Sequence, residues 1–303
     1  MTANSLDRAP APTYTPSANP AASGTPALPG IPPGTGKGRG HLDRFGETDR
    51  TDAWWVQPLA QALGLLGLIG YANWAAFQGN HYLYEGNGAD YLSPFYSPTL
   101  KPAWWPLSPA FLILIFPLGF RTTCYYYRKA YYRAFFSDPA ACAVGERTSK
   151  GYCGEAKFPF ILQNIHRYFL YAALVILVIL WWDVIKSARF HVDGGFRFGI
   201  GGGTLGILAS TGLLTLYTFS CHSLRHIIGG RLDCFSCAAG GGPQQKAWGI
   251  VSLLNARHMA WAWWSLFAVC FADFYVRMCS MGIIKDIVFF PFDLFSNAGS
   301  TGL

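Results

Sequence analysis

Charge is scarce in this chain. Only 13% of its 303 residues are Asp, Glu, Lys or Arg, while 51% are hydrophobic, and this balance argues against an ordinary soluble protein. The net charge is +7, but the basic residues lie beside apolar segments in no basic stripe, which argues against a nucleic-acid partner. The first fifty residues lack the apolar stretch of a signal peptide and are rich in Pro, Ala, Thr and Gly. We therefore predict a disordered cytoplasmic tail over residues 1–50.

Long apolar runs, in contrast, are frequent. A membrane-spanning helix needs roughly 20 mostly apolar residues, and the abundant Trp, Tyr and Phe suit membrane interfaces. The segments that qualify lie at about Trp54–Phe77, Trp104–Tyr127, Pro159–Lys186, Gly203–Gly229 and Trp248–Met278. The sequence therefore predicts an all-α polytopic membrane protein. Its bundle of five transmembrane helices occupies residues 51–287, and an outer C-terminal tail occupies residues 288–303. Every loop between these helices is too short to form a soluble domain.

Basic residues predict the orientation of the chain. Arg44 and Arg50 directly precede the first span, and further Lys and Arg residues follow the second and fourth spans. Loops rich in Lys and Arg stay in the cytoplasm. The loop over residues 78–100 contains Glu85 and Asp90 and has neither Lys nor Arg, as expected of an outer loop. We predict a multi-pass protein of the inner (plasma) membrane with a cytoplasmic N-terminus.

Three histidines fall at one depth in the predicted helices. His166 follows Pro159 by seven residues, His258 follows Val251 by seven, and His222 precedes the helix stop at Gly229 by seven. At about 1.5 Å per residue, each lies roughly 10 Å below the cytoplasmic face. A b-type haem needs two opposed imidazoles from neighbouring helices, so these residues offer a pair and one spare. A lone intramembrane His can simply join two helices by a hydrogen bond, but three at one level favour a function.

His81 and His191 form a second candidate pair near the outer face. Each follows the outer end of a predicted span by about one helical turn. A haem held there would complete a two-haem ladder across the membrane. The alternative is that both histidines are solvated loop residues.

Polar residues at the cytoplasmic surface are candidates for contacts with a quinone or with haem propionates. His222 and His226 are four residues apart on one helical face, and Arg225 is three residues from His222. One His can face iron while Arg225 and His226 face a propionate or a quinone carbonyl. An interfacial aromatic and basic belt explains the neighbouring residues equally well. The further candidates at this surface are Ser223, Tyr125 and Arg128.

Four cysteines fall in predicted cytoplasmic loops, where disulfides are rare. Cys234 and Cys237 form a C-x-x-C pair, and with Cys142 and Cys153 they could supply four thiolates to zinc or an iron-sulfur cluster. We favour free thiols near a partner subunit. Asp183 and Asp273, toward the outer ends of spans three and five, belong either to a proton path or to the membrane interface.

Three segments carry a resemblance to a known family: HSLRHIIGGRLDCFS, NARHMAWAWWSLFAVCFADFYVRM and FGIGGGTLGIL. They resemble the single-chain cytochrome b anchor of succinate dehydrogenase and fumarate reductase, in its five-helix, two-haem class. The resemblance implies a subunit that docks a flavoprotein and an iron-sulfur protein on its cytoplasmic face. It also implies two b haems and electron transfer from the iron-sulfur protein to menaquinone.

The resemblance implies haem ligands at only some positions of this sequence. His81 and His191 match the outer haem ligands approximately, and His258 matches the inner ligand on span five. Span two, with the segment RTTCYYYRKAYY, contains no His, so His166 or His222 must supply the second inner ligand. We favour His222, because spans four and five are joined by a short loop.

Two other functions stay open at this stage. One is a haem-free anchor that binds only quinone and its partner subunits. The other is a transporter whose buried His and Asp residues relay protons, although the segments show no inverted repeat.

Overall fold

The computed structural model describes residues 44–86, 88–137, 139–146, 160–192, 195–230, 234–237 and 240–292. It is mostly helical. Of the predicted tail over residues 1–50, residues 1–43 lie outside the described residues. The α-helices are α1 (Val56–Gln78), α2 (Ala110–Thr122), α3 (Tyr125–Tyr131), α4 (His166–Ser187), α5 (Gly202–Phe219), α6 (His222–Gly229), α7 (Gly241–Asn255) and α8 (His258–Ser280).

In the described part of the chain, four helical segments are long and apolar enough to cross a membrane. They are Val56–Gln78, Ile161–Ser187, Gly202–Phe219 and His258–Ser280. The predicted second span is shorter than expected, because α2 begins only after Pro109 and ends at Thr122. Its 13 residues extend roughly 20 Å, less than the hydrocarbon core of a bilayer. The prediction of five full-length transmembrane helices is therefore not confirmed.

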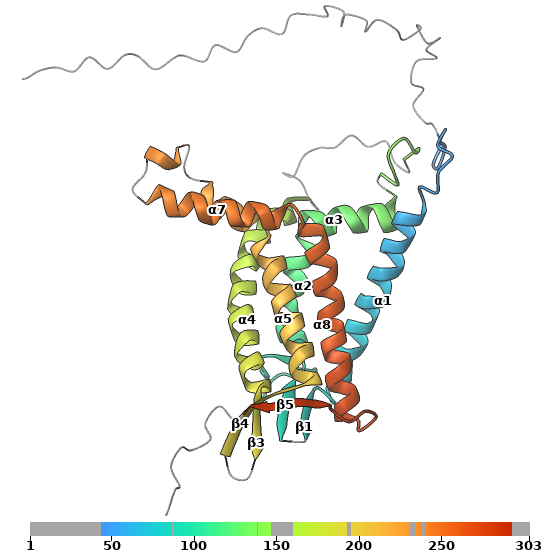
Figure 1. Ribbon diagram of the computed structural model, residues 1–303. Coiled ribbons are helices and arrows are strands. Elements are labelled where there is room, and N and C mark those ends of the chain that lie inside the picture. Colours follow the sequence, from blue (N-terminus) through green and yellow to red (C-terminus); the bar gives the residue numbers. More distant parts are fainter. Residues whose placement is uncertain are drawn as a thin grey trace, which may run out of the picture. The chain divides into compact units, whose positions relative to one another are not determined.

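Three of the predicted spans are broken near the end where the sequence places the three histidines at one depth. The fourth span divides at Ser220 and Cys221 into α5 and α6, and the fifth divides at Ala256 into α7 and α8. The second span divides in the same way, since Cys124 separates α2 from α3. Both cysteines have extended backbones, with ψ of 129° at Cys124 and 136° at Cys221, and such a residue cannot continue a helix. Helices α3 and α7 consequently lie across this end of the bundle (Figure 1).

The opposite end of the bundle carries an antiparallel sheet, which the all-α prediction missed. Five strands pair in chain order. They are β1 (Leu83–Gly86), β2 (Ala89–Leu92), β3 (Arg189–Val192), β4 (Gly195–Gly201) and β5 (Val288–Phe292), and they lie below the helices in Figure 1. Strand β5 includes the first residues of the predicted C-terminal tail; residues 293–303 lie outside the described residues. The Asn87–Gly88 dipeptide between short apolar runs is a hairpin signal that length-based reading of the spans did not use.

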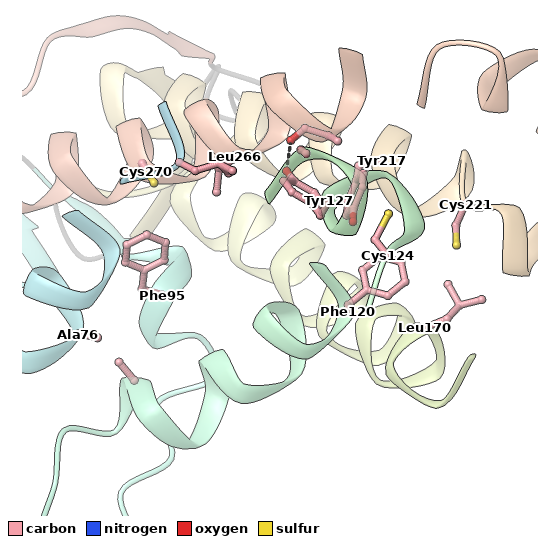
Figure 2. Close-up of a cluster of buried hydrophobic side chains, with 14 of the residues drawn as sticks. Ala76, Phe95, Phe120, Cys124, Tyr127, Leu170, Tyr217, Cys221, Leu266 and Cys270 are labelled. Carbon is pink, nitrogen blue, oxygen red and sulfur yellow. Dashed lines mark hydrogen bonds between the residues drawn. The ribbon is translucent and has the colours of Figure 1, made fainter. Parts of the chain in front are cut away.

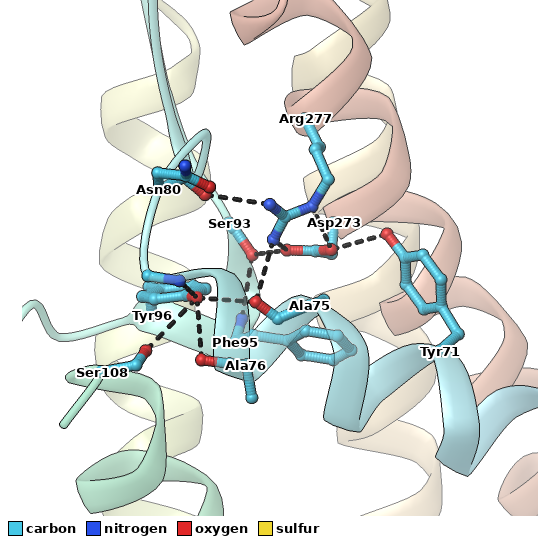
Figure 3. A network of polar contacts seen from close by, with 11 residues as sticks. Tyr71, Ala75, Ala76, Asn80, Ser93, Phe95, Tyr96, Ser108, Asp273 and Arg277 are labelled. Atoms are coloured by element: carbon cyan, nitrogen blue, oxygen red, sulfur yellow. Dashed lines mark hydrogen bonds and ion pairs between the residues drawn. The ribbon is translucent and has the colours of Figure 1, made fainter.

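Buried charges fix the helices to the loop at the sheet end (Figure 3). Asp273 and Arg277 of α8 are both fully buried and pair with each other, with Nε to Oδ2 at 3.4 Å. Asp273 also accepts hydrogen bonds from the Tyr71 hydroxyl at 2.6 Å and from the Ser93 hydroxyl. Arg277 donates to the carbonyl of Asn80 at 2.9 Å, just beyond the end of α1. These bonds join α1, α8 and the loop before α2, so buried polar groups are satisfied as stability requires.

An apolar cavity of about 480 Å³ lies inside the bundle between the two ends. Pro94 and Phe95 line it on the sheet side, and Tyr127 and Arg121 line it on the side of the helix breaks. The remaining lining is almost entirely aliphatic and aromatic, from α1, α2, α4, α5 and α8. The cavity thus extends from the loop before α2 to Phe120 and Tyr217, whose rings are stacked on His166 and His258.

Candidate functional site

Four helix ends supply two cysteines and two histidines to one buried region. Cys124 and Cys221 stand at the N-termini of α3 and α6, immediately after the breaks described above. His166 and His258 are the first residues of α4 and α8. Both thiols are buried, and Figure 2 shows them within the main apolar cluster of the bundle.

His166 is held by residues from two different helix breaks. Its Nδ1 lies 2.9 Å from the Thr123 hydroxyl, and its Nε2 lies 3.1 Å from the Cys221 sulfur. The Phe120 ring is stacked on the imidazole, with the ring centroids 4.7 Å apart and the planes 5° from parallel. The side chain is buried, with 8% of its surface exposed. The position of this imidazole is therefore fixed at both nitrogens and on one face.

His258 is held in a reciprocal way. Its Nδ1 lies 2.6 Å from the Ser220 hydroxyl, and its Nε2 lies 3.4 Å from the Cys124 sulfur. The Tyr217 ring is stacked on it at a centroid distance of 5.1 Å. Each helix break thus offers a hydroxyl to one histidine and a thiol to the other. This exchange of partners places both imidazoles between the same two breaks.

The donor atoms form two His–Cys pairs, and among the described residues no three His, Cys, Asp or Glu side chains converge on a single ion. Tetrahedral zinc needs all four donors around one centre, so the arrangement favours a larger group that each pair can reach. A haem needs two opposed Nε2 atoms with a flat slot between them, whereas here each Nε2 faces a thiol. These residues do not fit an inner haem. They fit an iron-sulfur cluster with mixed Cys and His ligands, of the kind in which two His replace two Cys.

A buried, unpaired hydroxyl at the same place supports this fit. Tyr217 lies beside Cys124 (Figure 2), and its hydroxyl is buried with no hydrogen-bond partner among the described residues. A buried polar group of this kind ordinarily finds a partner. A sulfur-containing group bound by the two cysteines would offer an acceptor to it.

His222, the favoured partner of His258 in the sequence, lies elsewhere. Since α5 ends before Cys221, His222 belongs to α6 and is exposed. Its Nε2 lies 2.9 Å from Nε2 of His226, one helical turn later. His166 therefore takes the place beside His258 that the sequence analysis favoured for His222. The equal depth of the three residues was computed for unbroken helices, and the break at Cys221 turns His222 away.

The other candidates at this surface lie on α3 and α6. Arg225 donates from Nε to the Ser252 hydroxyl at 2.9 Å, and its guanidinium lies 4.7 Å from the centroid of a Trp248 ring. The Arg128 guanidinium lies 4.6 Å from the ring centroid of Tyr125, which is exposed. Ser223 is half-buried at the start of α6. Whether any of them contacts a quinone stays a prediction.

The outer candidates His81 and His191 lie at the sheet. His81 precedes β1 and is exposed, with φ of 55°. His191 belongs to β3, where its Nε2 lies 3.4 Å from Asp90 and its ring contacts Phe196. The partner of His191 is thus a carboxylate of the neighbouring strand, and a haem between His81 and His191 stays a prediction.

The loop cysteines behave differently from the prediction. Cys234 and Cys237 form a disulfide, so they are not free thiols. The two-residue turn between them brings their Cα atoms to 5.4 Å, within the range that a disulfide requires. Cys142 is exposed and free, and Cys153 lies outside the described residues.

Cys124 and Cys221 are the residues that the sequence analysis missed. A signal for them was present, because each follows an apolar run, at the level where His166 and His258 begin the next runs. Only the histidines were compared for depth, and the search for thiol ligands was restricted to loops.

Apolar helices around buried polar residues define a polytopic membrane protein. The family described as actinobacterial succinate dehydrogenase subunit SdhC matches residues 56–282. A solved structure, the Mycobacterium smegmatis Sdh1 complex in the apo form, contains a similar chain at 42% identity and a TM-score of 0.71. The match covers 81% of this chain and 94% of that chain. No curated protein matches.

The chain therefore belongs to the actinobacterial SdhC family. It is a non-flavin subunit of succinate dehydrogenase, a succinate:quinone oxidoreductase, and serves as its membrane anchor. This confirms the resemblance at the level of the enzyme; the five-helix, two-haem class is not confirmed.

Proposed function

We propose that this anchor carries electrons from an iron-sulfur subunit, through an inner centre held by His166, His258, Cys124 and Cys221, to a quinone. The partners are the flavoprotein and iron-sulfur subunits of the same complex, docked on the cytoplasmic face. The quinone is menaquinone, and the chain is a multi-pass protein of the plasma membrane with a cytoplasmic N-terminus. The outer haem b between His81 and His191 stays a prediction and is not part of this proposal.

The observation that carries the proposal is the reciprocal pairing of the two imidazoles with the two thiols. Both Nε2 atoms face sulfur at 3.1 and 3.4 Å, and all four residues stand at helix ends. Polar groups in a membrane are costly, so such a set favours a functional site over simple helix packing. A cluster bound here would supply one-electron transfer between the soluble partner and the quinone.

The hydroxyls of Thr123 and Ser220 prepare the imidazoles for this role. A hydroxyl oxygen that accepts a hydrogen bond from Nδ1–H fixes the tautomer in which Nε2 has its lone pair free for a metal. Phe120 and Tyr217 cover the rings and keep water from them. The protein thus orients neutral imidazole donors in a dry site before anything binds.

The apolar cavity supports the quinone part of the proposal. Its lining is suited to an isoprenoid chain, and it extends to Tyr127 and Arg121 beside the histidine region. Ligand sites of this kind combine a largely apolar wall with few polar groups.

The test is chemical analysis and spectroscopy of the purified complex. We expect iron and acid-labile sulfide in excess of what the iron-sulfur subunit alone contains, and loss of this excess in Cys124→Ser and Cys221→Ser. Cys279→Ala, which alters a buried thiol at the far end of α8, serves as the control and should retain it. A reduced b-type α band that is lost in His258→Ala, with no excess sulfide, would overturn the inner iron-sulfur centre in favour of haem.

A further inference from the structure

One half-buried guanidinium faces this region, and among the described residues no carboxylate pairs with it. Arg121, in the last turn of α2, donates from Nη1 to the Tyr127 hydroxyl at 2.5 Å and to the Ala262 carbonyl at 3.2 Å. Its Nη2 donates to the Ser265 hydroxyl at 2.9 Å. All three acceptors are neutral. Since an Arg side chain cannot lose its proton in a protein, a full positive charge lies at the wall of the cavity.

The charge is separated from the inner site by one aromatic ring. The Arg121 guanidinium lies 4.7 Å from the centroid of Tyr217, and the same Tyr217 ring is stacked on His258 at 5.1 Å. The adjacent residue Phe120 is stacked on His166. Arg121 therefore lies within roughly 10 Å of the His258 imidazole, in surroundings where charges are weakly screened.

Another arginine in the apolar helices is held differently. Arg277, near the sheet end of α8, is buried against the carboxylate of Asp273. An uncompensated charge in apolar surroundings is costly and is retained where it has a role. The neutral acceptors around Arg121 hold its position and leave its field directed at the site.

We propose that Arg121 raises the reduction potential of the inner centre by stabilising its reduced, more negative state. This inference rests on the proposed function, because it requires a redox centre at His166, His258, Cys124 and Cys221. An added electron is attracted by a fixed positive charge, and the oxidised state gains less from it. Arg121 acts on the centre through its electric field and is not one of its ligands.

The experiment is a redox titration of the whole complex, followed by the EPR signal of the inner centre. In Arg121→Gln, which keeps hydrogen-bond donors but loses the charge, we expect the ratio of reduced to oxidised centre at fixed ambient potential to fall about tenfold. For a one-electron couple this is a downward shift of about 59 mV. Arg121→Lys keeps the charge and should stay within a few fold of the wild type.

A second pair of variants tests the charge without removing Arg121. Ser265→Asp places a carboxylate beside the guanidinium and should lower the potential, whereas Ser265→Asn, of the same size, should not. If the Gln and Lys variants shift equally, or if Ser265→Asp and Ser265→Asn behave alike, Arg121 is only structural and the inference is overturned. If the wild-type complex lacks an EPR signal that depends on Cys124, the proposed function itself fails, and the inference with it.

Discussion

The two ends of this bundle both bury polar side chains, but they do so in opposite ways. At the sheet end two buried carboxylates lie beside a cation: Asp273 pairs with Arg277, and Asp183 lies 3.9 Å from Lys186. At the end with the helix breaks neutral imidazoles and thiols face one another, and the guanidinium of Arg121 donates to neutral acceptors.

The difference indicates different tasks. The Asp273–Arg277 pair joins α8 to α1 and to the loop before α2, and removal of one partner leaves the other buried charge unsatisfied. The imidazoles and thiols at the helix breaks bond to each other only weakly, since thiols are poor donors and acceptors. Such groups can exchange these contacts for contacts with a bound group. The sheet end thus stabilises the fold, and we propose that the end with the helix breaks binds a further group.

The largest effect is expected from breaking the outer pair. Asp273→Asn removes the charge that faces the buried Arg277 and should destabilise the protein by about 3–5 kcal/mol. The thermal midpoint of the purified complex should fall, while any inner centre that still assembles should keep its EPR signal. Asp90→Asn is the matched control, since this Asp lies exposed at the sheet, and its midpoint should stay near the wild type. An unchanged midpoint in Asp273→Asn would contradict the stabilising role of the Asp273–Arg277 pair at the sheet end.

A smaller effect is expected from pH at the exposed histidine pair of α6. Partial burial, then His226 and the Arg225 guanidinium, lower the pKa of His222 below its ordinary value. A His whose pKa is lowered in the folded state favours that state fully at a pH above the unfolded-state pKa. This contribution is lost as the pH falls from the unfolded-state pKa through the folded-state pKa. The thermal midpoint should therefore decrease modestly from pH 7.5 to 5.5.

The pH effect can be assigned by substitution. In His222→Gln the decrease should become smaller, whereas in the control His81→Gln, which alters an exposed His outside the pair, it should persist. Equal pH dependence in all three proteins would contradict the assignment of the decrease to His222.

The apolar helices could be predicted from the sequence because a bilayer imposes their length and composition. The breaks could not, because the run through Phe219, Ser220 and Cys221 has no Pro or Gly to mark them. Extended backbones at Cys124 and Cys221 depend on tertiary contacts with His166 and His258. The sheet was missed for a similar reason, since its strands of four to seven residues gain stability only by pairing across distant loops.

The candidate site was predicted in part. Depth along an ideal helix selected His166 and His258, which the structure brings to the same pair of helix breaks, but it also selected His222, which the break at Cys221 turns to the surface. Cys124 and Cys221 were overlooked because thiols inside apolar segments resemble ordinary small hydrophobic residues. Only the folded chain shows that each thiol faces an imidazole.

The most direct test of the inner site is pulsed EPR of the reduced complex with ¹⁵N-labelled histidine. Two inequivalent imidazole nitrogens should couple to the unpaired spin, and one coupling should disappear in His166→Gln and the other in His258→Gln. A spectrum whose ligand couplings come only from cysteine β-protons, with no histidine nitrogen, would contradict ligation by His166 and His258.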